Sequence, residues 1–187
     1  MITSPMNTYD EMVKDLIKND SSVVFNNISA DHAKFIIKSF VDEAKQSIEI
    51  LSGSFCKAFY SNIDFYNCLE SAAKRINSTE KIKIITLNNT DYAAIKEKLA
   101  LINKTIGLDV ITYVPCQYLG KEPIKHFMVV DNKRYREEEP HEEFEQENMP
   151  QNVKASVCCN GVKKANELSS KFNSIWDALK VKTPIHA

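Results

Sequence analysis

Short runs of strand-forming residues alternate with longer amphipathic segments along most of this chain. In the longer segments apolar residues recur three and four positions apart, the spacing of one buried helix face. The expected strands cover residues 22–25, 48–51, 81–87, 108–114 and 153–159, and the expected helices cover residues 9–18, 31–47, 64–76, 95–106 and 162–179. This alternation predicts an α/β domain with a mixed, mostly parallel sheet flanked by helices on both faces.

The length of 187 residues suits one domain with small extensions. We assign residues 29–182 to the α/β domain, residues 1–28 to an N-terminal extension with a short helix, and residues 183–187 to a tail.

The segment 123–141, PIKHFMVVDNKRYREEEPH, predicts a β-hairpin late in the chain. The apolar run 127–130 leads into a turn-forming Asp131-Asn132 pair, and strand formers follow. A hairpin adds antiparallel pairing to the sheet. Because His126 and His141, two of the four histidines, flank the hairpin, we look for a site here first.

The overall composition excludes several classes of protein. A net charge of −1 gives no general attraction to nucleic acid or to a membrane surface, and no apolar run approaches the roughly 20 residues of a membrane span. The chain does not start with the basic and apolar segments of a secretory signal. Its five cysteines are an odd number without a CxxC pair, which indicates free thiols in a reduced, cytoplasmic setting.

Several stretches resemble one half of the phospholipase D superfamily fold, in order along the chain: DEAKQS, IEILSGS, ESAAKRIN, KIKIITLNN and the terminal ASVCCNGVKKANELSSKFNSIWDAL. The resemblance runs from about Asp31 to Leu179 and implies a phospholipase D-like domain. In that family two halves or two subunits face each other across one site. The resemblance therefore implies a homodimer for a single half-domain.

The chemistry of the family requires a His-x-Lys-x-x-x-x-Asp motif, in which the histidine attacks the phosphodiester and the lysine holds phosphate charge. Alignment on Asp131 puts Ile124 at the histidine position and His126 at the lysine position. Alignment on His126 instead puts Met128 and Lys133 at the other two positions. Neither register restores the motif, so the mechanism of the family is not supported.

The catalytic candidates that remain are His126, Asp131 and His141. His126, beside Lys125, has an imidazole that titrates near neutral pH and suits a nucleophile or a base. The alternative, which we favour, is a strand histidine that makes one hydrogen bond.

The ligand candidates are Lys125, Arg134, Arg136, Ser52 and Ser54. The period of two puts both arginines on one strand face, where they would clamp a phosphate or a carboxylate. We favour pairing with the neighbouring glutamates instead. The two serines end a strand, where α/β folds bind ligands, but the residues around them favour a turn.

The acidic segment Glu137 to Glu147 has the charge to attract a basic protein partner or a cation. His141 with Glu139 or Glu143 is a weak metal pattern, and we predict a solvated loop, no metal and no cofactor. The same charge disfavours a nucleic-acid groove nearby. Strand alternation lets only one of Cys158 and Cys159 face inward.

Together these observations favour a non-catalytic, self-associating binding or assembly module. The first alternative is a phosphodiesterase or nuclease with a nonstandard site around His126 and Arg136. The second is a sensor domain that binds a small anionic ligand through the arginines.

Overall fold

The structure is a computed structural model that describes residues 8–27, 29–53, 55–56, 58–87, 92–117, 124–139 and 153–182. Its elements follow in the order α1 (Tyr9–Lys18), β1 (Val24–Asn27), α2 (Ala30–Asp42), β2 (Ile48–Ser52), α3 (Ile63–Ile76), β3 (Ile82–Leu87), α4 (Tyr92–Ile106), β4 (Ile111–Cys116), β5 (Phe127–Val130), β6 (Arg134–Glu138), β7 (Ala155–Cys158) and α5 (Val162–Lys182). Strands and helices therefore alternate as the sequence predicts, up to the hairpin.

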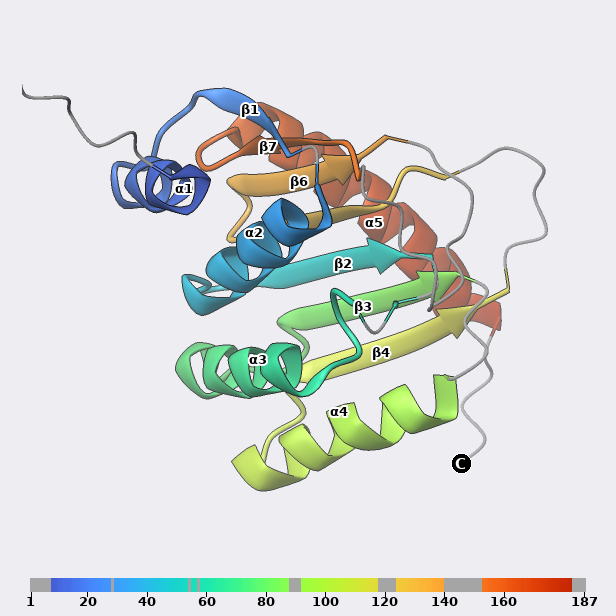
Figure 1. The fold of residues 1–187 in the computed structure, drawn as a ribbon. Helices are drawn as coiled ribbons and strands as arrows, with labels where there is room; N and C mark the ends of the chain where they lie inside the picture. The colour runs from blue at the N-terminus through green and yellow to red at the C-terminus, as the bar shows by residue number, and fades with distance from the viewer. Residues whose placement is uncertain are drawn as a thin grey trace, which may run out of the picture.

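The seven strands form one mixed sheet in the order β1-β7-β6-β5-β2-β3-β4 (Figure 1). The strands β2, β3 and β4 are parallel, and the other four pairings are antiparallel. The predicted α/β class is confirmed, but "mostly parallel" is not accurate. The reason is that β5 joins the free edge of β2 antiparallel, and every strand added beyond it reverses direction again.

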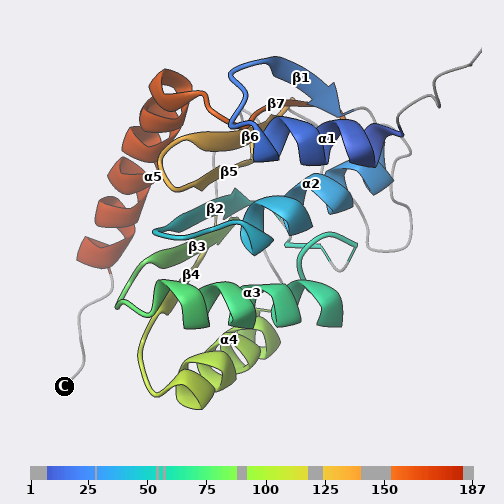
Figure 2. The same cartoon turned by 90° about the vertical axis from the view of Figure 1, so that its left-hand side faces the viewer.

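Helices cover both faces of the sheet, as Figure 2 shows. On one face α1, α2, α3 and α4 bury a large core that includes Phe40, Ile50 and Ile84. On the other face α5 is the one helix among the described residues that packs against a smaller core, to which it contributes Phe172 and Trp176. Alternate residues of the central strands point to opposite cores, so both sides of these strands are buried.

The predicted hairpin is confirmed. Both turn residues, Asp131 and Asn132, have positive φ angles of 54° and 55°, and the Lys133 amide donates to the Val130 carbonyl over 3.2 Å. Positive φ at both central positions is the type I′ geometry, whose twist matches that of paired strands. The turn sets the register that pairs Val130 with Arg134 and Met128 with Arg136.

The covered faces explain where the structure differs from the sequence interpretation. Cys158 and Cys159 are both buried, at 1% and 0% exposed, so the prediction that only one of them faces inward was wrong. Each thiol points to a different core because helices cover both faces. The proposed N-terminal extension contributes β1 to the sheet and the fully buried Val13 to the larger core.

Among the described residues, no helix combines the length and the apolar character needed to cross a membrane.

The turn geometry gives a first prediction. We expect Asn132→Val to lower the free energy of unfolding by about 1–2 kcal/mol, because a β-branched residue tolerates positive φ poorly. Asn132→Gly removes the same side chain without that backbone cost and should be the more stable variant. Urea denaturation followed by circular dichroism measures the difference. Equal stability of the two variants would show that the turn does not constrain the hairpin.

Candidate functional site

Four polar side chains meet on the α2–α3 side of the sheet, near the carboxyl end of β2. His126 directly precedes β5, and the Glu138 amide donates to the His126 carbonyl over 2.8 Å, so these two residues lie side by side. Arg136 lies two residues before Glu138 on the same face of β6, and Asn27 ends β1. We call His126, Arg136, Glu138 and Asn27 the buried polar cluster.

The Arg136 guanidinium is the centre of the buried polar cluster. Arg136 is only 1% exposed, its Nη1 donates to Glu138 Oε1, and its Nε donates to Asn27 Oδ1 over 2.9 Å. Its Nη2 has no hydrogen-bond partner among the described residues. The other carboxylate oxygen of Glu138 lies 3.3 Å from His126 Nδ1. One carboxylate therefore contacts both the guanidinium and the imidazole.

A group of aromatic side chains from α3 and the segment before it lies close enough to this cluster for the Arg136 and Glu138 charges to act on Tyr60. Phe55 and Tyr60 stack with ring centroids 4.9 Å apart, and Phe65 packs edge-on against both rings. Burial raises the pKa of the Tyr60 phenol; the nearby Arg136 charge lowers it and the Glu138 charge raises it again. Burial also raises the pKa of the Cys56 thiol, so neither group is an activated nucleophile.

The glutamates beside the cluster each pair with a cation. Glu138 pairs with Arg136, Glu139 lies 3.6 Å from Lys125, and Glu137 lies 3.1 Å from Lys164 on α5. The predicted arginine–glutamate pairing is therefore present for Arg136, although it is buried and not on the surface. A carboxylate close to each of these cations reduces the positive charge that a phosphate would meet.

Asp131 and Arg134 lie at the opposite end of the hairpin from His126. The Asp131 carboxylate accepts the backbone amides of Lys45, Gln46 and Ser47 over 2.7–3.1 Å. Its second oxygen lies 3.4 Å from Arg134 Nη1. These contacts give Asp131 a role in folding and occupy it away from His126. Arg134 and Arg136 share a strand face as predicted, but they belong to different clusters.

The remaining predicted residues do not add to this site. Ser52 ends β2 and is 6% exposed. Ser54, His141 and residues 140–147 of the acidic segment lie outside the described residues. Within the described part of the chain, no three His, Cys, Asp or Glu residues are placed to hold a metal ion.

Sequence reasoning missed Asn27 and Tyr60. Asn27 is 109 residues from its partner Arg136, and no local pattern links the two. The only local sign was an asparagine pair, Asn26-Asn27, at the end of an expected strand.

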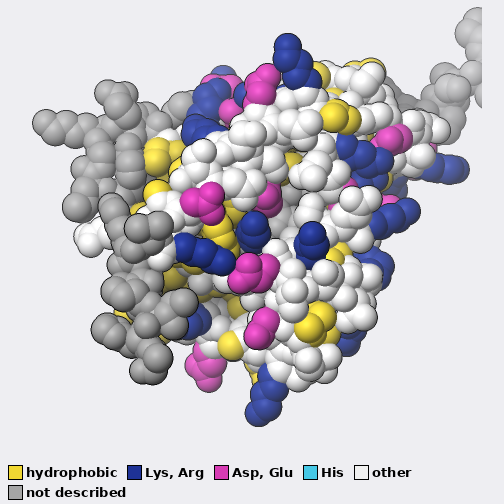
Figure 3. Space-filling model, turned by 180° about the vertical axis from the view of Figure 1, so that it is seen from behind, with side chains coloured by type: hydrophobic (Ala, Val, Ile, Leu, Met, Phe, Trp, Pro, Cys, Tyr) yellow, Lys and Arg dark blue, Asp and Glu magenta, His cyan; other side chains and the backbone are white. Residues whose placement is uncertain are grey.

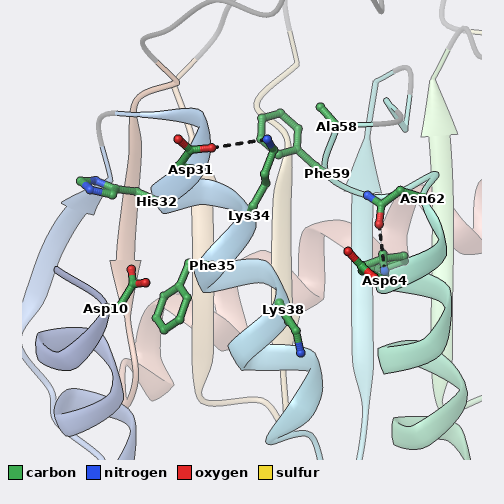
Figure 4. Close-up of a pocket in the computed structure, with 11 residues that line it drawn as sticks. Asp10, Asp31, His32, Lys34, Phe35, Lys38, Ala58, Phe59, Asn62 and Asp64 are labelled. Atoms are coloured by element: carbon green, nitrogen blue, oxygen red, sulfur yellow. Dashed lines mark hydrogen bonds and ion pairs between the residues drawn. The ribbon is translucent and has the colours of Figure 1, made fainter. Parts of the chain in front are cut away.

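A cavity of about 610 Å³ opens on the same side of the molecule, between α2 and the start of α3 (Figure 4). Its lining mixes three aspartates (Asp10, Asp31 and Asp64) with Lys34, Lys38 and aromatic rings. Asp31 and Lys34 pair with each other over 3.4 Å, and the Asp31 side chain is 91% exposed. The cavity therefore carries charge of both signs, and its lining favours neither an anionic nor a cationic ligand.

Several solved structures are similar to this chain. TrmBL2, an archaeal chromatin protein described with a novel mode of DNA binding, matches 90% of this chain with 12% identity and a TM-score of 0.59; the chain spans 57% of the length of TrmBL2. Nuc from Salmonella typhimurium, a phospholipase D family member, matches 83% of this chain and 94% of its own with 23% identity and a TM-score of 0.55. NucT from Helicobacter pylori matches 83% and 97% with 13% identity and a TM-score of 0.57.

These similarities show that the chain has a phospholipase D superfamily-like fold. No protein-family model and no curated protein matches the sequence.

The buried charges give a second prediction. We expect Arg136→Met to lower the free energy of unfolding by about 3–5 kcal/mol, because it leaves the Glu138 carboxylate buried without its cation. The double variant Arg136→Met, Glu138→Leu should recover a large part of that loss. Urea titration measures both. The control Lys74→Met removes an exposed ion pair and should change stability by less than about 0.5 kcal/mol. Additive losses in the double variant would contradict the proposed coupling.

Proposed function

We propose that the chain is a non-catalytic phospholipase D-like binding or assembly module that associates with a second copy of itself. The observation that carries the proposal is the charge balance of the buried polar cluster. Glu138 contacts both Arg136 and His126, the residues that a phosphodiesterase site would use. A site of that kind needs an activated nucleophile and cations directed at the phosphate.

The positions that match the family motif support the same proposal. Ile124, at the histidine position, has an alkyl side chain that cannot attack phosphorus. Asp131 matches the aspartate position, but its carboxylate accepts backbone amides of the loop before β2. The fold is also found in TrmBL2, which is described as a chromatin protein, so this architecture occurs in a protein with a binding role.

One observation favours a phosphodiesterase as the second candidate. The Glu138 carboxylate lies 3.3 Å from His126 Nδ1, and a carboxylate in that position orients an imidazole. The same pair also suits a purely structural hydrogen bond, so activity decides between the two functions.

The third prediction concerns catalysis. We expect no turnover of bis-p-nitrophenyl phosphate or of single- or double-stranded DNA, with or without Mg²⁺ or Mn²⁺, because the nearby cations are neutralised by carboxylates. His126→Ala and the control His32→Ala, which alters a histidine on α2, should behave like the wild type. Turnover that His126→Ala abolishes and His32→Ala retains would establish the phosphodiesterase instead. Circular dichroism confirms that each variant is folded.

Self-association is proposed because the sequence resembles a single half of the phospholipase D fold, and the similarity extends over 94% and 97% of Nuc and NucT. Two such units complete the two-fold arrangement that the resemblance implies. We propose that the end of the sheet at which Lys125 and His126 lead into β5 faces the second copy.

The fourth prediction follows from this arrangement. Size-exclusion chromatography with light scattering should give about twice the chain mass of 21.3 kDa. Lys125→Glu, which reverses a charge at the proposed interface, should shift the protein toward monomer, whereas the control Lys98→Glu on α4 should not. A monomer at all concentrations tested would contradict self-association without affecting the prediction about catalysis.

A further inference from the structure

A second cavity lies on the other face of the sheet, far from the buried polar cluster. It has a volume of about 390 Å³ and lies between α5 and the amino ends of β2 and β3. The eleven described residues that line it are all polar or charged. Ligand pockets in proteins are mostly apolar, so a lining of this kind fits only a strongly polar ligand.

The helix α5 contributes a continuous polar stripe to this cavity. Asn166, Ser169, Ser170 and Asn173 recur three and four residues apart, which places them on one side of the helix. The adjacent stripe, with Phe172 and Trp176, packs in the apolar core. The helix therefore presents amide and hydroxyl groups to the sheet where further apolar packing would otherwise continue.

Glu49 points into this cavity from β2. The residue is only 8% exposed, and burial raises the pKa of its carboxyl group. Ser169 Oγ donates to Glu49 Oε2, and Asn173 Nδ2 lies 3.5 Å from Glu49 Oε1. A buried carboxylate is costly at a position between a sheet and a helix, and its two neutral partners do not neutralise its charge.

Lys83 supplies the opposite charge from the neighbouring strand. It lies directly across from Glu49 in the parallel pairing of β2 and β3. Its Nζ donates to Asn173 Oδ1 over 3.4 Å and lies 5.5 Å from the centre of the Trp176 ring. The Asn173 amide thus contacts both Lys83 and Glu49, and no ion pair joins the two charges among the described residues. One anion and one cation are held apart in one polar cavity.

We propose that this cavity binds a small zwitterion with a polar side chain, of the α-amino acid type. Its ammonium group contacts Glu49, its carboxylate contacts Lys83, and the amides and hydroxyls of α5 contact its polar side chain. The face seen from behind the view of Figure 1 carries basic side chains interspersed with acidic ones (Figure 3), so neither sign of charge dominates this side of the molecule. This inference is independent of the proposed function.

Isothermal titration calorimetry of the full chain with L-serine, L-asparagine and L-glutamine tests the proposal and is our fifth prediction. At least one of them should bind, and Glu49→Gln and Lys83→Met should each weaken binding by about tenfold or more. Matched controls are Glu70→Gln and Lys74→Met, which alter an ion pair on α3 and should bind like the wild type. Glu49→Gln should be at least as stable to heat as the wild type, because it removes a buried charge.

Two analogues of glutamine test the charge requirement on the wild-type protein, without any variant. Glutaramic acid lacks the α-ammonium group and 4-aminobutanamide lacks the carboxylate, and both should bind at least about tenfold more weakly than glutamine if glutamine binds. Absence of binding by all three amino acids overturns the proposal. So does binding that either analogue matches, or that Glu49→Gln and Lys83→Met leave unchanged.

Discussion

The Asp131 carboxylate holds the two halves of the sheet together. It accepts three consecutive backbone amides, from Lys45 to Ser47, in the loop that leads into β2, and the Asp131 amide donates back to the Ser47 carbonyl over 3.0 Å. Hydrogen bonds to a charged group contribute about 1.5–3 kcal/mol each. This loop starts the parallel half of the sheet and the turn at Asp131 starts β6, so one side chain fixes the antiparallel β5 beside β2.

The residue that stabilises the fold and the histidine considered for catalysis therefore lie at opposite ends of the same hairpin strand. Asp131 lies at the turn, where its contacts are needed for the architecture whether or not a reaction takes place. His126 lies at the other end of the same strand, where its Nδ1 lies 3.3 Å from a Glu138 carboxylate oxygen. An aspartate that matches a catalytic motif is therefore no sign of catalysis when its oxygens accept backbone amides.

Local sequence patterns predicted the helices and strands. Most of the contacts that form the candidate sites join residues far apart in the sequence, and local patterns did not predict those. The Asp131-Asn132 pair predicted the hairpin because few residues tolerate two successive positive φ angles. The order of the strands is not encoded locally, so the number of antiparallel pairings was missed. Asn27 contacts Arg136 across 109 residues, a relation that no periodicity reveals. Glu49 and Lys83 each alternate with isoleucines and look like solvent-facing strand positions until α5 is placed over them.

Two pairs of charged side chains on the sheet, Arg136 with Glu138 and Glu49 with Lys83, differ in how each charge is balanced. Arg136 and Glu138 are in direct contact, so their opposite charges largely cancel and little net charge is left for a ligand. Glu49 and Lys83 are kept apart by the Asn173 amide beside a cavity, so each charge stays available to a partner of opposite sign. Burial is costly in both cases, but only direct contact offsets the cost within the chain itself. The separated pair is the one whose cost a bound zwitterion would offset, because it brings both missing charges in one molecule.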